Sequence, residues 1–199
     1  MTDTPAGRSM TATEYLAWER EQLDKHEFHH GEVIQRSVCS LRHCFLAASI
    51  SSELHHAIRE DGCAVLSSNM RIGTPDRQHY VYPDAVVVCG RAQTEPGTND
   101  VLISPAVVVE ILSPSSETYK RGTKWAAYQL IPSLTDYLLV SQDQPYIEHY
   151  AREAEGWRYL VYRSGDSITL VNQLTTQLTT RAQLAVDAVY ERAFDLHAG

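Results

Sequence analysis

Two carboxylates stand inside stretches of this chain that are otherwise almost entirely apolar. Asp84 lies in the run from Tyr80 to Val88, and Glu110 lies in the run from Ala106 to Leu112. Both runs are rich in β-branched residues and apolar at successive positions, which is typical of strands covered on both faces. An unpaired carboxylate there costs several kcal/mol or takes up a proton. The chain must therefore fold so that each acid meets a partner.

The partners of these two acids can be of two kinds. A buried lysine, arginine or backbone amide can hold each acid separately. If the two strands are neighbours, the acids can instead share a divalent cation, because carboxylate oxygens are suitable ligands for it. Since there are two acids, with further polar residues in register, we favour a shared metal site at Asp84 and Glu110.

The positions around the two acids resemble part of a known spacing. Pro83 cannot donate a hydrogen bond to a neighbouring strand, so we expect an edge or a bulge that re-aims Asp84. On the second strand, the period of two places Glu110 and Leu112 on one face. A metal nuclease site of the form Pro-Asp…Glu-x-Lys would have its lysine at position 112, which is leucine here.

A lysine recurs in the next predicted helix, which begins near Glu117 after a serine cap and ends before Pro132. Lys124 and Tyr128 are four residues apart in the sequence and share a face of this helix. If the helix packs on the sheet through Tyr128, Lys124 can reach Glu110. The alternative is that Lys124 is a solvated surface charge.

These segments resemble the Uma2 family, a bacterial branch of the PD-(D/E)XK nuclease superfamily. The segments that carry the resemblance are His26-Glu27-Phe28-x-x-Gly31-Glu32-Val33, His43, Tyr82 to Cys89, Val108 to Ser115, Tyr119-x-Arg121-Gly122-x-Lys124, and Ile131-Pro132-Ser133-Leu134-x-x-Tyr137. They occur in a fixed order over nearly the whole chain. The resemblance implies that the lysine of the strand has moved to the following helix, which accounts for Leu112 and Lys124 together.

The resemblance also implies a function and a set of site residues. It implies an endonuclease that hydrolyses phosphodiester bonds of DNA, with Mg²⁺ or Mn²⁺ as cofactor. Asp84, Glu110 and the carbonyl group of Ile111 would ligate the metal, and Lys124 would orient or deprotonate the attacking water. Glu27 is a further candidate catalytic acid; the alternative is a solvent-facing carboxylate.

Three more residues are expected to support the site or to contact phosphate, namely His43, Tyr128 and Arg121. For His43, a neutral structural histidine is an open alternative, because the first turn of a helix disfavours positive charge.

The chain departs from the family pattern at three positions. His30 and Ser116 stand where the family usually has Asp and Thr, and Lys120 stands where it usually has the Asp of a Tyr-Asp-Arg-Gly segment. The last change reverses a charge close to Lys124. Two alternative functions therefore stay open. One is a nuclease-fold module that binds a partner without turnover, and the other is a phosphodiesterase that acts on RNA or nucleotides.

Composition restricts the class of protein. With 199 residues, of which 43% are hydrophobic and 21% are charged, the chain has the values of one globular domain. We expect a single nuclease-like domain over 1–199, with residues 1–10 disordered. No apolar run approaches the ~20 residues that span a bilayer, and the N-terminus lacks the apolar core of an export signal. We therefore expect a cytoplasmic protein without a membrane partner.

Cysteine content and charge add two expectations. The four cysteines have no CxxC spacing, so we expect reduced, mostly buried thiols. The net charge of −8 argues against a protein that coats nucleic acid indiscriminately. A local basic rim around the acids can still form from Arg71, Arg77, His79 and Arg91 beside the Asp84 strand and from Lys120, Arg121 and Lys124 on the following helix. The alternative is that most of these are scattered, solvated charges.

The order of predicted elements indicates an α/β fold. We predict helices at 11–22, 41–60 and 117–131, strands at 63–72, 80–89, 106–112 and 136–140, hairpins at 27–37 and 146–163, and a short helix or strand at 184–194. This order predicts a restriction-endonuclease-like sandwich, with a central mixed sheet flanked by helices.

Aromatic residues are concentrated in the predicted C-terminal hairpin. Trp157, Tyr159 and Tyr162, together with Tyr146 and Tyr150, give more aromatic surface than one sheet face readily buries. They can pack within the fold or form a two-fold interface, and two sites related by a two-fold axis suit duplex DNA. We predict a homodimer.

Overall fold

The computed structural model describes residues 9–36, 38–58, 62–172 and 180–195. Of the segment 1–10 that was expected to be disordered, residues 1–8 lie outside the described residues. Met10 is ordered, and its amide donates a 3.0 Å hydrogen bond to the carbonyl group of Gly31. The end of the helix predicted at 41–60 also lies outside the described residues.

The main sheet has six strands. In order across the sheet they are β11 (Gly156–Arg163), β10 (Tyr146–Glu153), β9 (Asp136–Ser141), β8 (Val107–Leu112), β6 (Ala85–Cys89) and β3 (Cys63–Ser67). The pair β8–β9 is parallel, and all other neighbours are antiparallel. The sheet is therefore mixed, as the sequence predicts.

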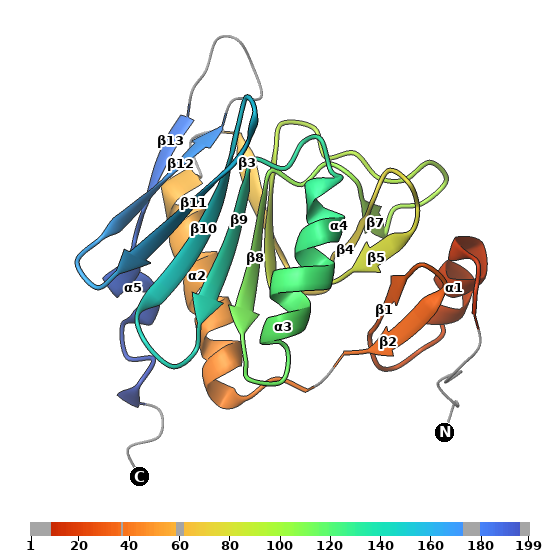
Figure 1. Ribbon diagram of the computed structural model, residues 1–199, viewed down its shortest axis with the longest axis horizontal. Coiled ribbons are helices and arrows are strands. Elements are labelled where there is room, and N and C mark those ends of the chain that lie inside the picture. The colour runs from red at the N-terminus through yellow and green to blue at the C-terminus, as the bar shows by residue number, and fades with distance from the viewer. Residues whose placement is uncertain (1–8, 37, 59–61, 173–179, 196–199) are drawn as a thin grey trace.

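Helices cover both faces of this sheet (Figure 1). On one face lies α2 (Leu41–Ile58), together with the small ribbon of β12 (Ser167–Asn172) and β13 (Thr180–Ala185) and the helix α5 (Val186–Tyr190). On the other face lies the helical segment α3 (Glu117–Tyr119), η1 (Lys120–Lys124) and α4 (Trp125–Gln129). The buried side chains on the two faces form separate apolar clusters, which is the packing of an α/β sandwich.

A second, smaller sheet lies beside the first and is built around the N-terminal part of the chain (Figure 1). Its strands, in order, are β2 (Glu32–Gln35), β1 (His26–His29), β5 (His79–Val81), β4 (Arg71–Gly73) and β7 (Val101–Leu102). The helix α1 (Ala12–Glu19) packs on β1, after the capping box formed by Thr11 and Glu14. This sheet brings the segment around residue 27 toward the main sheet.

Two of the predicted strands are each divided between the two sheets. The run predicted at 63–72 becomes β3 and β4, and the run predicted at 80–89 becomes β5 and β6. The second division falls at Tyr82, Pro83 and Asp84. Because proline has no amide hydrogen to donate, the ladder stops there and the chain passes from one sheet to the other. Asp84 therefore lies at a junction between two strands and outside any regular strand.

The hairpin β1–β2 turns at His30 and Gly31, as predicted. Both residues have positive φ angles, 49° and 94°, which is the backbone of a two-residue hairpin turn. A side chain at Gly31 would also collide with Ser9. His30, which stands where the family usually has Asp, thus lies in a turn with a positive φ angle, a backbone that few residues other than glycine adopt.

The prediction of reduced thiols was wrong. The structure pairs Cys39 with Cys44 and Cys63 with Cys89, and no cysteine in the described part of the chain is free. The strand register places Cys63 directly opposite Cys89, with a Cα–Cα distance of 4.0 Å. Sequence spacing does not reveal this pairing, because it depends on which strands become neighbours.

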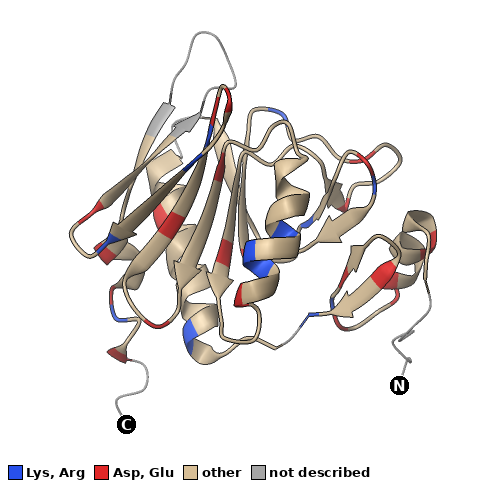
Figure 2. Ribbon diagram, in the orientation of Figure 1, with Lys and Arg blue, Asp and Glu red and all other residues tan. Residues whose placement is uncertain are grey.

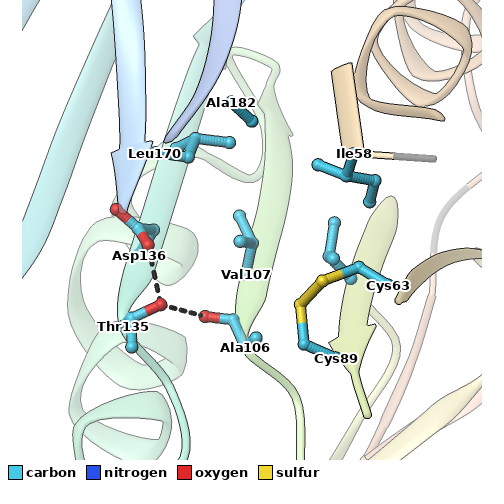
Figure 3. Close-up of a pocket in the computed structure, with 10 residues that line it drawn as sticks. Ile58, Cys63, Cys89, Ala106, Val107, Thr135, Asp136, Leu170 and Ala182 are labelled. Carbon is cyan, nitrogen blue, oxygen red and sulfur yellow. Dashed lines mark hydrogen bonds between the residues drawn. A yellow bond between two sulfur atoms is a disulfide. The ribbon is translucent and has the colours of Figure 1, made fainter. Parts of the chain in front are cut away.

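The Cys63–Cys89 bond lies beside a small apolar pocket, drawn in Figure 3. Ile58, Val107 and Leu170 contribute to its lining. In the register of the sheet, Cys89 and Val107 lie at the end of β6 and β8 that is opposite to Asp84 and Glu110. This pocket is therefore separate from the predicted site.

Part of the aromatic surface of the C-terminal hairpin is buried within the chain itself. The ring of Trp125 on α4 stacks on Tyr137 at 5.1 Å and lies 4.5 Å and 4.8 Å from the rings of Tyr150 and Trp157. Tyr159 remains exposed. This packing buries much of the aromatic surface on which the dimer prediction was based. The homodimer stays a prediction. None of the helices in the described ranges has the length and hydropathy needed to cross a bilayer.

Candidate functional site

The two carboxylates singled out in the sequence lie side by side on one face of the main sheet. The register of β6 and β8 pairs Val86 with Val108, so the next positions on that face are Asp84 and Glu110. Just beyond the regular ladder, the amide of Asp84 donates a 3.0 Å hydrogen bond to the carbonyl group of Val109. Both side chains are buried. Their face is the one covered by α3, η1 and α4.

A third acid, Glu27, reaches the same place from strand β1 of the smaller sheet. Its Oε1 atom accepts a 2.7 Å hydrogen bond from the amide of Tyr82, next to the junction between the sheets. Its Oε2 atom accepts a 2.6 Å hydrogen bond from the hydroxyl group of Tyr119. Glu27 is 3% exposed, so the alternative of a solvent-facing carboxylate is excluded.

A π-helical segment places two lysines over these acids. Lys120 and Lys124 are the first and last residues of η1, and both side chains are buried. A π-helix has a wider turn than an α-helix, with hydrogen bonds to the fifth residue, so residues four apart project from nearly the same side. Figure 2 shows basic positions gathered on this helical segment, against acidic positions on the strands behind it.

Lys124 contacts the acids that lie nearest to the smaller sheet. Its Nζ atom lies 2.9 Å from Glu27 Oε1 and 3.0 Å from the carbonyl oxygen of Tyr82, and it forms an ion pair with Glu110 Oε1. Its spacing from Tyr128 predicted that Lys124 can reach Glu110, and in the structure the two side chains are in contact. Its catalytic role stays a prediction.

Lys120 contacts the acids on the other side of the cluster. Its Nζ atom lies 2.8 Å from Asp84 Oδ2, 2.7 Å from the carbonyl oxygen of Ile111 and 3.0 Å from Glu110 Oε2. The sequence marked Lys120 only as a departure beside the site, whereas the structure places it at the centre. Glu110 thus bridges the two ammonium groups, with one carboxylate oxygen toward each.

The other oxygen of Asp84 faces the more exposed side of the cluster. Asp84 Oδ1 accepts a 3.0 Å hydrogen bond from His43 Nε2 and forms an ion pair with Arg36. The side chains of His43 and Arg36 are 13% and 20% exposed, compared with 2% for Asp84. These two residues therefore separate the buried acids from solvent. Sequence reasoning found His43 but missed Arg36, because Arg36 follows a short strand and carries no motif.

The charges of the cluster balance within the chain. Burial raises the pKa of the Asp84 carboxyl, but the hydrogen bond from His43 and the charges of Lys120 and Arg36 outweigh burial and hold this pKa well below its usual range. Burial likewise lowers the pKa of Lys120, but the carboxylates of Glu110 and Asp84 raise it above its usual value. Asp84 is therefore ionised, and Lys120 is an ammonium ion.

The same balance applies to Glu27. Burial raises the pKa of its carboxyl, but the charge of Lys124 and the hydrogen bonds from Tyr119 and Tyr82 lower it below the usual value. Three carboxylates, those of Glu27, Asp84 and Glu110, thus face three cations, those of Arg36, Lys120 and Lys124.

Tyrosine hydroxyl groups hold the remaining polar atoms. Tyr128 donates a 2.8 Å hydrogen bond to Glu110 Oε1, and Tyr137 donates a 3.0 Å hydrogen bond to the carbonyl oxygen of Lys120. Burial, reinforced by the charge of Glu110, raises the pKa of both hydroxyls well above its usual value, so both stay protonated. Tyr128 therefore lies in the site as predicted from its spacing to Lys124.

Arg121 is the one candidate that the structure does not bring to the cluster. Its guanidinium group pairs with Glu117 at 2.8 Å and with Glu148. Members of the proposed basic rim are also engaged elsewhere. Arg77 pairs with Glu95 at 2.8 Å, and Arg71 donates to the hydroxyl group of Tyr82 at 2.9 Å. Of the helix residues expected in this rim, Lys120 and Lys124 contact the acids, while the more exposed side of the cluster carries Arg36 and His43, which were not part of the proposed rim.

The oxygen atoms at the centre of the site are of the kind that binds Mg²⁺ or Mn²⁺. Asp84 Oδ2, Glu110 Oε2 and the carbonyl oxygen of Ile111 surround one point, and Glu110 Oε2 has no directed hydrogen bond. That point is the Nζ atom of Lys120. No group of three or more His, Cys, Asp or Glu residues in the described ranges is arranged to hold a metal. The three oxygens are thus of the kind that suits a divalent ion, and in this structure the ammonium group of Lys120 takes the place between them.

The chain has relatives of similar length. It is 31% identical over 182 residues to the uncharacterized protein slr1290 of Synechocystis sp. (strain ATCC 27184 / PCC 6803 / Kazusa), which covers 91% of each chain. It is 30% identical over 143 residues to the uncharacterized protein sll1609 of the same organism, which covers 72% of this chain and 81% of the relative.

A solved structure has the same fold. The crystal structure of a protein from Anabaena variabilis ATCC 29413, titled "putative nuclease belonging to DUF820", superimposes with a TM-score of 0.71 and 18% sequence identity. The match covers 92% of this chain and 99% of the other. The predicted α/β sandwich, with a mixed sheet between helices, is therefore confirmed, and this chain shares its fold with that protein.

A family model matches most of the sequence. The model is Uma2, described as "Putative restriction endonuclease", and it matches residues 12–186. The matched range includes each acid and each lysine of the cluster, from Glu27 to Lys124. The resemblance noted in the motifs is therefore confirmed, and the chain belongs to the Uma2 family of restriction-endonuclease-like proteins.

Proposed function

We propose that this protein is an endonuclease that hydrolyses phosphodiester bonds of DNA, with Mg²⁺ or Mn²⁺ as cofactor. The observation that carries this proposal is the convergence of Asp84 Oδ2, Glu110 Oε2 and the carbonyl oxygen of Ile111 on one point, beside the ammonium group of Lys124. Family membership and the nuclease fold support it.

Asp84, Glu110 and Ile111 would hold the metal ion. When bound, such an ion lowers the pKa of a water ligand and stabilises charge on the reacting phosphate. Because Asp84 is fixed by the amide of Ile111 at 2.7 Å and Glu110 by the hydroxyl group of Tyr128, both carboxylates are already oriented. This is the preorganisation that a catalytic site needs.

Lys124 supplies a positive charge next to these carboxylates. Glu27 and the carbonyl group of Tyr82 hold its ammonium group, so that the charge does not depend on a flexible side chain at the surface. In the proposed reaction, Lys124 orients the attacking water and stabilises negative charge on phosphate. Glu27 acts through Lys124 and is therefore a positioning residue.

The phosphate group would approach from the side of His43 and Arg36, because the other described sides of the cluster are covered by the two sheets and the helical segment. DNA as the substrate implies a cytoplasmic location, and a homodimer would present two sites to the two strands of a duplex. Both belong to the proposal.

A second candidate function is a nuclease-fold module that binds nucleic acid or a protein without turnover. The observation that favours it is the balanced charge of the cluster, in which Lys120 already satisfies the acids without a metal ion. A further alternative is a phosphodiesterase that acts on RNA or a nucleotide, and the same experiment distinguishes RNA from DNA as the substrate.

The test is cleavage of supercoiled plasmid, linear duplex, single-stranded DNA and RNA, each with Mg²⁺, Mn²⁺ or EDTA. We expect the wild type to cut DNA with metal and Glu110→Gln to lose this activity. Glu32→Gln, which changes an exposed acid on β2, is the matched control and should cut like the wild type. Failure of the wild type to cut any DNA with either metal contradicts the proposal. Cleavage of RNA alone would then favour the RNA phosphodiesterase, and no cleavage of either nucleic acid would favour the binding module.

A further inference from the structure

The ammonium group of Lys120 has the surroundings of a bound cation. It contacts two carboxylate oxygens and one carbonyl oxygen, at 2.7 to 3.0 Å, from Asp84, Glu110 and Ile111. Two of these contacts, to Asp84 Oδ2 and the carbonyl oxygen of Ile111, are hydrogen bonds, and the third, to Glu110 Oε2, is an ion pair. The side chain is 6% exposed, so water supplies little of its solvation.

The two lysines of η1 are not equivalent in this respect. Lys124 contacts Glu110 through Oε1, and its other partners are Glu27 and the carbonyl group of Tyr82. Of the two lysines, only Lys120 contacts Asp84 Oδ2 and the carbonyl oxygen of Ile111. These are the two atoms that would complete a metal site with Glu110 Oε2. Of the two lysines, Lys120 is therefore the one whose ammonium group lies where a metal ion would bind.

Charge prevents the Lys120 ammonium group and a divalent metal ion from occupying the site together. With Lys120 in place, three carboxylates face three cations, and a divalent ion added beside them would leave a buried excess of positive charge. The distances leave no room for a second cation between Lys120 Nζ and its three oxygens. A divalent ion can bind only if the ammonium group leaves.

We propose that Lys120 is a built-in competitor of the divalent metal ion, so that its ammonium group and the ion exclude each other from the oxygens of Asp84, Glu110 and Ile111. This inference rests on the proposed function for the identity of the competing ion. It adds that the wild-type chain binds this ion weakly, and that removal of one ammonium group creates a strong site. Metal-dependent activity is then limited by the movement of a single side chain.

The test is binding of Mn²⁺ to the full chain, after treatment with EDTA and dialysis, by calorimetry and by the electron paramagnetic resonance signal of free Mn²⁺. Lys120→Met removes the ammonium group and keeps an unbranched side chain. We expect it to bind one Mn²⁺ at least about tenfold more tightly than the wild type. Lys25→Met is the control for the loss of one nearby positive charge, since Lys25 acts on Asp84 through its charge but contacts the carbonyl group of Ser68 and none of the three oxygens, and its gain in Mn²⁺ affinity should be much smaller.

Two further variants locate the effect. Lys120→Met combined with Asp84→Asn should lose the gain, because the second change removes a proposed ligand. If Lys120→Met does not fold without metal, Lys120→Gln keeps one hydrogen-bond donor for the carboxylates and is used in its place. A gain below about tenfold, or an equal gain in Lys25→Met, overturns the inference.

These outcomes separate the inference from the proposed function. Tight Mn²⁺ binding by Lys120→Met without cleavage of DNA by either chain supports the competitor and contradicts the nuclease. Cleavage by the wild type with Mg²⁺, together with unchanged Mn²⁺ affinity in Lys120→Met, supports the nuclease and contradicts the competitor.

Discussion

The hydroxyl group of Tyr119 donates a 2.6 Å hydrogen bond to Glu27 Oε2, and this bond connects the buried acids to a pair of histidines. His29 Nε2 contacts the same hydroxyl group, and His29 Nδ1 lies 2.7 Å from His79 Nδ1. Because Tyr119 donates to Glu27, it accepts from His29, and His29 must then accept from His79. A neutral His29 satisfies every member of this chain of hydrogen bonds.

The first prediction concerns pH and stability. Burial lowers the pKa of His29 from 6.5 to about 4, although the nearby Glu27 opposes this shift. Since the folded pKa is the lower one, the unfolded chain binds more protons between these two values. The stabilising contribution is present above pH 6.5 and is lost as the pH falls toward 4. We expect a loss of about 2 to 3 kcal/mol from this residue, measured by urea unfolding at a series of pH values.

The control for this prediction is an exposed histidine of α2. His29→Gln should flatten the dependence on pH between neutral and mildly acid conditions, whereas His55→Gln should leave it as in the wild type. An unchanged pH dependence in His29→Gln would show that other groups cause the loss.

The second prediction concerns the hydrogen bond between Tyr119 and Glu27. Tyr119→Phe leaves Glu27 with one fewer donor in a buried environment, and it also removes the acceptor of His29. We expect a destabilisation of about 1 to 3 kcal/mol in urea unfolding. Tyr159→Phe removes a hydroxyl group from a side chain that is 51% exposed, and it should have a much smaller effect. Equal effects of the two changes would argue against a special role for Tyr119.

The third prediction reverses an expectation that the sequence alone suggests. Two neighbouring acids without a metal ion should repel each other, so Asp84→Ala would be expected to stabilise the chain. In the structure Asp84 is paired with Lys120, Arg36 and His43, and its removal leaves buried cations without a partner. We expect Asp84→Ala to lower the free energy of unfolding in EDTA by about 3 to 5 kcal/mol.

The control for Asp84→Ala is an acid at the surface. Asp24→Ala changes an exposed residue that accepts one hydrogen bond from Gln35, and it should change stability by at most about 1 kcal/mol. A more stable Asp84→Ala chain would mean that the acids repel each other and that Lys120 does not compensate for them.

The fourth prediction concerns the cysteines. Thiol titration of the denatured chain without reducing agent should find no free thiols among the four cysteines of the sequence. The bond between Cys63 and Cys89 closes a loop over a sequence separation of 26 residues, so its removal by a double change to serine should cost about 3 kcal/mol. Four reactive thiols in the freshly purified chain would instead support the reduced state that the sequence suggested.

The fifth prediction concerns assembly. A homodimer would give twice the 22.4 kDa mass of the chain in light scattering at micromolar concentration. Tyr159 is the most exposed of the aromatic residues described in the C-terminal hairpin, so Tyr159→Ala should shift the mass toward the monomer. A monomer mass for the wild type contradicts the dimer and indicates a chain that acts alone or with another partner.

The sequence by itself determined the core of the fold and the pair of acids at its centre. Apolar β-branched runs identify strands β6 and β8, and the period of two places Asp84 and Glu110 on a common face once the strands are neighbours. The spacing between Lys124 and Tyr128 likewise placed both over Glu110, because residues four apart share the face of a helix. These inferences need only local geometry and the cost of burying a charge.

Only the tertiary structure decided which residues meet these two acids. Glu27 lies on the smaller sheet and Arg36 directly follows its strand β2, and the connection of this sheet to the main sheet depends on the break at Pro83. Lys120 lies four residues before Lys124 and on the same side of η1, but only the fold brings its partners, Asp84 and the carbonyl group of Ile111, under this helical segment. The competition between an ammonium group and a metal ion depends on distances of 2.7 to 3.0 Å, and such distances are fixed by packing between elements far apart in the chain.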